Sequence, residues 1–86
     1  MKKYRKKPID VDAIQWTGEN IDEMCLFLGS NNLTIERSPT KNHLYFWTSQ
    51  GMALAKKGDY IIKEIDGEFY PCKKDIFAKT YEKISE

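Results

Sequence analysis

Residues 58–84 read GDYIIKEIDGEFYPCKKDIFAKTYEKI, and this stretch decides the fold of the 86-residue chain. An apolar run at 60–65 is followed by Asp66-Gly67, and both of these residues tolerate the positive φ of a tight hairpin turn. The chain then returns through residues 68–71. The stretch therefore predicts a β-hairpin.

The end of the same stretch predicts a helix and a closing strand. Residues 73–79 suit a short helix that turns Ile76 and Phe77 inwards. Residues 80–84 alternate between apolar and polar side chains, as a half-buried strand does.

Upstream, segments rich in β-branched and aromatic residues are separated by short turns. Gln50-Gly51 joins two of these segments and predicts a second hairpin. Together the segments predict strands at 33–37, 43–49 and 52–55.

The first part of the chain predicts a strand and then a helix. Residues 9–16 open with apolar and acidic side chains in alternation, which is the period of a strand. Asn20 is placed as a helix N-cap, with Glu23 at capping-box spacing. Gly29 ends this helix, because glycine readily adopts the left-handed conformation. One apolar stripe lies between the two ends: Ile21, Met24, Cys25 and Leu28.

These elements predict an α+β fold, a small and strongly bent antiparallel sheet or open barrel with two short helices. Residues 1–86 are expected to form a single domain, since no repeat or linker divides them. A chain of this size buries only about 60–65% of its unfolded surface. Because so thin a core gains from further burial, we expect a homo-oligomer.

Charge is distributed unevenly along the chain. Five of the first seven residues are Lys or Arg, whereas the rest carries nine basic and thirteen acidic residues. This basic arm, residues 1–7, grips phosphates or an acidic partner in one interpretation. In the other it keeps the protein soluble and frays as a chain terminus does. Composition leaves both open.

The cysteines and the single histidine do not predict catalysis or a metal. No nucleophile elbow, phosphate-binding loop or zinc-protease motif is present, and no Cys/His ligand set occurs. Cys25 lies on the helical stripe and is expected to be buried. Cys72 stands beside Lys73 and Lys74 at a strand-to-helix corner, where its thiol pKa would be lowered, although a packed cysteine is the simpler interpretation. We expect a non-enzyme without cofactor or metal.

Aromatic side chains supply candidates for stacking on a ligand. Trp47 and Tyr45 share one face of their strand and Phe46 lies on the other, while Phe69 and Tyr70 point in opposite directions. One member of each set is therefore turned away from the main core, unless both faces are covered. Such a ring stacks on a base, fills a partner's pocket or packs in a second small core.

The opening KKYRKKPIDVDAIQWTG at 2–18, together with residues 58–84, resembles a family of small proteins encoded by bacteriophages and prophages of Gram-positive bacteria. The resemblance implies a phage or prophage origin and action in the cytoplasm of the host cell, and it supplies no catalytic residues. No apolar run approaches the roughly 20 residues that span a bilayer, so no membrane partner is expected.

The favoured hypothesis is a non-catalytic phage accessory protein that sequesters an anionic small molecule, such as a nucleotide signal in counter-defence, or binds a host protein. The alternatives are a nucleic-acid-binding regulator that uses the basic arm, and a minor virion or assembly protein. In the favoured hypothesis basic residues meet the charge and aromatic residues stack. The candidates are Arg5, Lys7, Lys73 and Lys74 for charge and Trp16, Trp47 and Tyr70 for stacking.

Overall fold

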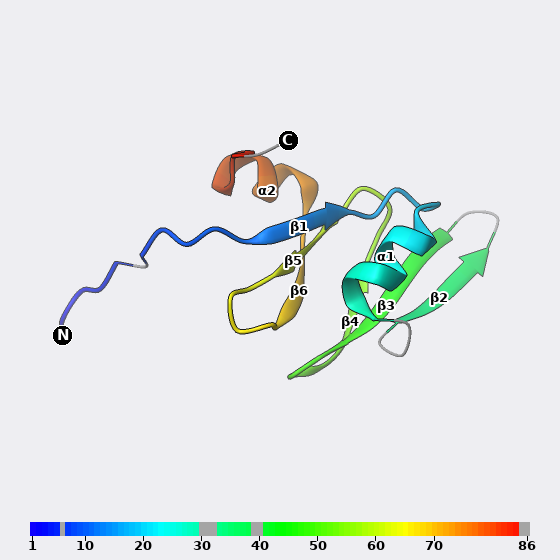
Figure 1. The fold of residues 1–86 in the computed structure, drawn as a ribbon, viewed down its shortest axis with the longest axis horizontal. Helices are drawn as coiled ribbons and strands as arrows, with labels where there is room; N and C mark the ends of the chain where they lie inside the picture. The colour runs from blue at the N-terminus through cyan, green and yellow to red at the C-terminus, as the bar shows by residue number, and fades with distance from the viewer. Residues whose placement is uncertain (6, 30–32, 39–40, 85–86) are drawn as a thin grey trace.

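The computed structural model describes residues 1–5, 7–29, 33–38 and 41–84 and contains two helices and six strands within them (Figure 1). Residues 1–5 run away from the body as an extended chain (Figure 1). The elements in chain order are β1 (Asp12–Gln15), α1 (Ile21–Leu28), β2 (Leu33–Ser38), β3 (Lys41–Thr48), β4 (Gly51–Ala55), β5 (Tyr60–Lys63), β6 (Phe69–Cys72) and α2 (Lys74–Thr80).

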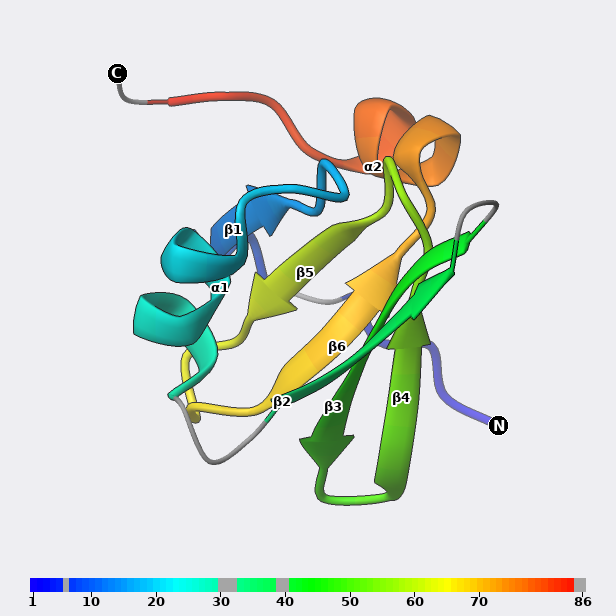
Figure 2. The ribbon, with the colours of Figure 1, turned by 90° about the vertical axis from the view of Figure 1, so that its right-hand side faces the viewer.

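The strands form two antiparallel sheets of three strands each, in the orders β1-β5-β6 and β2-β3-β4. The α+β class is confirmed, but the strands are divided between two sheets instead of sharing one bent sheet. Figure 2 shows β6 of the first sheet beside β3 and β4 of the second, and residues of β4 and β6 are in contact. The two sheets therefore pack against each other through β6 of one and β3 and β4 of the other.

Strand β1 is shorter than the predicted 9–16 because its partner ends. Asp12 pairs with Lys63, which is the last residue of β5. Residues 9–11 extend beyond that pair and have no strand of the described chain opposite them. A strand requires a hydrogen-bonded neighbour, so alternation alone overestimated its length.

The hairpin between β5 and β6 is confirmed, but its turn is longer than a two-residue turn at Asp66-Gly67. The Glu64 N–H donates to Glu68 O at 2.8 Å, so three residues form the loop. Only the glycine of the pair has positive φ. This loop length sets the register Tyr60↔Cys72, one residue away from the register that a two-residue turn would produce.

Helix α1 begins after Asn20, as predicted, but the Asn20 side chain does not cap the helix. Its Oδ1 accepts hydrogen bonds from the Thr17 N–H and hydroxyl at 2.9 and 3.0 Å, and its Nδ2 donates to the Glu23 carboxylate at 2.7 Å. The residue therefore organises the turn before the helix. Gly29 ends α1 with φ of 90° and donates its N–H to Cys25 O.

The main core lies between α1 and the two sheets. Met24 and Leu28 of α1 are buried as the stripe predicted, whereas Cys25 is only half-buried. Phe27 adds an edge contact to Phe69 across the core, with ring centroids 5.4 Å apart. The buried cluster comprises Trp16, Met24, Leu28, Leu44, Phe46, Ala55 and Ile61.

Helix α2 covers the opposite face of the β1-β5-β6 sheet. Ile61 lies in the main core, so its neighbour Ile62, also fully buried, points to the other side. Tyr60 shares that side and stacks on Phe77 of α2, with centroids 3.8 Å apart and planes within 7°. Phe77 faces inwards as predicted, but Ile76 is 52% exposed, which contradicts the prediction.

The predicted final strand at 80–84 is wrong. Helix α2 continues to Thr80, and residues 81–84 have no regular secondary structure. Tyr81 is held by its side chain: the ring stacks on Phe77 at 5.0 Å and the hydroxyl lies 3.2 Å from that of Tyr70. Side-chain packing, without a strand partner, fixes this segment.

Candidate functional site

A hollow of about 500 Å³ lies where β4, the turn before β5, and the junction of β6 with α2 come together. We call it the lysine hollow, because three of its side chains are lysines. Two carboxylates and a small apolar surface complete it. Its lining is Leu54, Lys56, Asp59, Pro71, Cys72, Lys73, Lys74 and Asp75.

The turn that supplies Lys56 is firmly tied to the core. The Lys56 N–H donates to an Asp59 carboxylate oxygen at 3.0 Å, and the Asp59 N–H donates to Lys56 O at 2.9 Å. Gly58 takes a φ of +98° and donates its N–H to Trp16 O at 2.7 Å. Asp59 thus acts mainly as a clamp on this turn, and it holds the Lys56 backbone in place.

The hairpin register brings this turn next to Lys73 and Lys74, where β6 meets α2. Tyr60 is the first residue of β5 and pairs with Cys72, the last residue of β6. The next residues outwards, Asp59 and Lys73, therefore lie at the same end of the sheet. Lys73 has extended backbone before α2, and Lys74 is the first residue of the helix. Sequence reasoning missed Lys56, because the predicted two-residue turn gives a register one residue away from the one observed.

Cys72 does not behave as an activated thiol. Burial raises the pKa of the Cys72 thiol, and the carboxylates of Asp59 and Asp75 raise it further. Its Sγ lies 3.6 Å from Lys73 O. The neighbouring lysines therefore do not produce the lowered pKa considered for a reactive cysteine, and the half-buried packed cysteine is the interpretation that the geometry supports.

Trp16 is excluded as a stacking residue, which corrects the sequence-based candidate. Its side chain is 1% exposed within the main core, and its indole Nε1 donates to Asn42 O at 2.7 Å. No ligand reaches a ring in this position without opening the core. The function of this tryptophan is structural.

Trp47 and Tyr70 lie apart from the lysine hollow. Trp47 is 55% exposed and pairs across the strands with Met52, on the face of β3 opposite the buried Phe46. The expected division of these aromatics between two faces is confirmed. Tyr70 is turned to the α2 side, where its hydroxyl donates to Glu64 at 2.7 Å.

The two candidates in the arm, Arg5 and Lys7, are also remote from the hollow. Arg5 is exposed, and Lys7 lines a second groove of about 800 Å³. The seven sequence-based candidates therefore do not form one site. Only Lys73 and Lys74 come together, and they do so with Lys56.

The lysine hollow suits an anion that also carries an apolar part. Three ammonium groups outnumber two carboxylates, one of which is occupied in the turn, and Leu54 and Pro71 supply apolar contact. Within the described residues, no group of three or more His, Cys, Asp and Glu side chains is placed to hold a metal ion. Neither α1 nor α2 is long and apolar enough to cross a membrane.

Comparisons with models of protein families, with curated proteins and with solved structures each gave no match. The resemblance to phage-encoded proteins therefore stays a prediction from the sequence.

Proposed function

We propose that this protein is a non-catalytic binding protein that holds an anionic small molecule in the lysine hollow. The observation that carries the proposal is the convergence of Lys56, Lys73 and Lys74 on one hollow from separate parts of the chain. Together with the phage resemblance, it favours an accessory protein that sequesters a small anion in the host cytoplasm. A nucleotide is the probe that matches this chemistry, since it joins phosphate to an aromatic base whose ring faces can contact apolar side chains.

The geometry supports binding more than catalysis. The cysteine in the hollow has a raised thiol pKa, and the aspartate of the turn accepts a backbone hydrogen bond. Ammonium groups bind phosphate by electrostatic attraction and hydrogen bonds, and no covalent step is needed. Each exposed lysine contributes only modestly to the free energy of binding. We therefore expect an affinity that depends on all three lysines together and decreases with added salt.

Binding is tested by isothermal titration calorimetry with a panel of mononucleotides, dinucleotides and cyclic dinucleotides. Lys73→Glu combined with Lys74→Glu should weaken binding by roughly 100-fold, because two attractive charges become repulsive. Lys56→Glu should weaken it by roughly tenfold.

Lys79→Glu is the matched control, since Lys79 is on the same helix but does not line the hollow. It should bind as the unchanged protein does. Equal affinity of the Lys73/Lys74 variant and this control would remove the hollow from the site. A panel without any binder would leave a host protein as the ligand class, to be sought by pull-down with the same variants.

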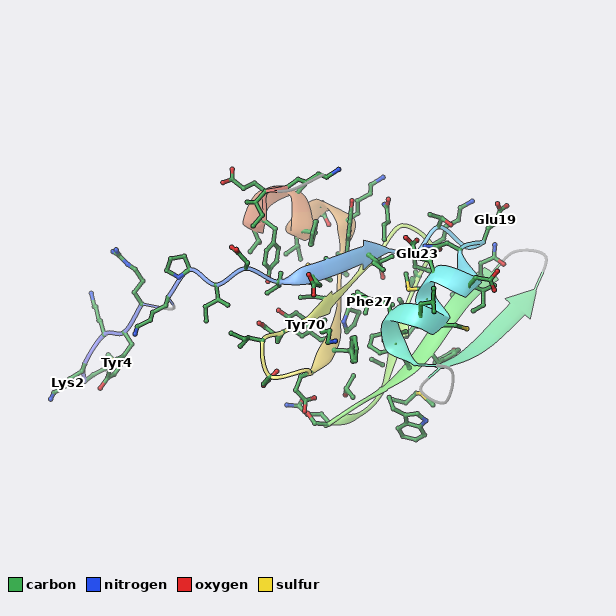
Figure 3. All side chains as sticks on the ribbon, viewed as in Figure 1. Lys2, Tyr4, Glu19, Glu23, Phe27 and Tyr70 are labelled. Atoms are coloured by element: carbon green, nitrogen blue, oxygen red, sulfur yellow. The ribbon has the colours of Figure 1, made fainter. Side chains whose placement is uncertain are left out.

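The second candidate function is nucleic-acid binding by the arm. Lys2, Tyr4 and Arg5 are exposed, and the arm projects from the body (Figure 3). This function predicts affinity for DNA or RNA that falls steeply with salt and is lost when residues 2–7 are deleted. The Lys73/Lys74 variant should leave such binding intact, which separates the two proposals.

A further inference from the structure

A groove of about 800 Å³ lies on the α2 side of the β1-β5-β6 sheet and shares no lining residue with the lysine hollow. Two chain segments, residues 7–13 and residues 80–84, line it together with Tyr60, Glu64 and Phe77. The rings of Tyr60, Phe77 and Tyr81 form a continuous stack there, with centroid separations of 3.8 and 5.0 Å. The groove thus combines aromatic surface with two extended stretches of chain.

The charges of this groove favour a cationic ligand. Four carboxylates line it, compared with two ammonium groups, and the aromatic faces attract cations as well. Glu64 accepts the Tyr70 hydroxyl at 2.7 Å, which orients one carboxylate at the groove. The acidic lining residues are Asp10, Asp12, Glu64 and Glu82, and the basic ones are Lys7 and Lys83.

The chain itself carries a segment with the complementary chemistry. The arm reads MKKYRKK, combining five cationic side chains with one aromatic ring. Tyr4 is 90% exposed, and Figure 3 shows Lys2 and Tyr4 far from the body. Ile9, at the base of the arm, is 44% exposed. An extended cationic segment and an acidic aromatic groove therefore occur in the same molecule.

Local geometry directs the arm away from its own groove. The arm continues directly into residues 7–13, which are one of the groove's own lining segments. Pro8 restricts Lys7 to extended conformations, so the chain continues outwards instead of folding back sharply. Six extended residues reach about 20 Å, enough to lie along a neighbouring molecule.

We propose that the arm of one copy docks in the groove of a second copy, and that the exchange is reciprocal. An antiparallel arrangement about Pro8 places residues 2–7 of one copy beside residues 9–14 of the other. Asp10 then lies opposite a lysine of the arm, and Asp12 lies opposite Tyr4 with a lysine diagonally on each side. Strand β1 is an edge of its sheet and offers backbone groups to the incoming chain. A two-fold dimer forms both contacts at once.

The test is sedimentation equilibrium on the full chain and three variants. The unchanged protein should form a dimer that weakens with added salt, and deletion of residues 2–7 should yield a monomer. Glu82→Lys should raise the dimer Kd roughly tenfold, because the two-fold dimer contains the altered charge twice. Asp22→Lys is the matched control: Asp22 is an exposed carboxylate on α1, and its reversal should leave Kd unchanged.

A synthetic peptide of residues 1–8 supplies the second measurement. It should bind the deletion variant in calorimetry, and the Glu82→Lys change should weaken that binding. The deletion removes no core residue, and circular dichroism checks its fold. A monomeric full chain would overturn the proposal, as would a dimer that persists after deletion of the arm. If the deletion variant does not fold, equal Kd values for Glu82→Lys and Asp22→Lys would overturn it.

Discussion

The indole Nε1 of Trp16 donates a hydrogen bond of 2.7 Å to the backbone oxygen of Asn42, across 26 residues of sequence. Trp16 follows β1 in one sheet, and Asn42 belongs to β3 in the other. The Trp16 backbone also exchanges hydrogen bonds with the turn that precedes β5: its N–H donates to Asp59 O, and its carbonyl accepts from Gly58. One buried residue therefore connects both sheets to the turn that carries Lys56.

Replacing Trp16 should weaken the fold much more than replacing the other tryptophan. Trp16→Phe leaves a void and removes the indole donor, so the free energy of unfolding should fall by about 2 kcal/mol. Trp47→Phe replaces a side chain that is 55% exposed, and it should change the free energy of unfolding by less than about 0.5 kcal/mol. Urea denaturation followed by circular dichroism measures both. Equal losses would contradict the burial of Trp16.

Adjacent residues of α2 should differ in their effect on stability. Phe77→Ala removes the ring between Tyr60 and Tyr81 and should lower the free energy of unfolding by about 2 kcal/mol. Ile76→Ala should lower it by less than about 0.5 kcal/mol, because Ile76 faces solvent. The same denaturation experiment compares the pair, and a larger effect at Ile76 would show that the helix is rotated.

Tyr70 should make the fold sensitive to alkali. Burial raises the pKa of the Tyr70 phenol far above its usual range, and hydrogen bonds with Tyr81 and Glu64 raise it further. Since the unfolded phenol ionises near pH 10, the stabilisation is complete below about pH 10 and is lost as the pH rises towards the folded pKa. Tyr70→Phe should flatten this alkaline decline in the free energy of unfolding. An unchanged slope in the variant would contradict the assignment.

Cys72 should react slowly with thiol reagents. Because the pKa of its thiol is raised, the thiolate fraction between about pH 7 and 9 is smaller than in a free cysteine peptide, and the rate profile shifts to higher pH. In a Cys25→Ser background, Asp75→Asn should move the profile to lower pH by removing one repulsive charge. Asp22→Asn, on the remote α1, is the control. A rate profile that lies at lower pH than that of the free peptide would contradict the raised thiol pKa and indicate a reactive Cys72. Cys72→Ser would then test the role of this thiol.

Local patterns predicted most elements, but they misplaced one turn, overextended one strand and predicted one strand that does not form. The turn between β3 and β4 is Ser49-Gln50 instead of the predicted Gln50-Gly51, because Thr48 pairs with Gly51. The alternation at 9–11 predicted a strand that lacks a partner, and the alternation at 80–84 predicted a strand where Tyr81 is instead held by ring stacking. The spacing at Asn20 located the start of α1 but not the hydrogen bonds of its side chain. In each case the missing information was which neighbour the segment meets in space.

The sequence by itself determined the α1 stripe, the existence of both predicted hairpins and the concentration of positive charge in residues 1–7. These features follow from periodicity and from backbone preferences within a few residues. Only the tertiary structure decided that Trp16 is buried and that Lys56 joins Lys73 and Lys74. The reason is register: a one-residue difference in the hairpin turn decides which side chains share a face and an edge, and that choice is settled by packing against the rest of the chain.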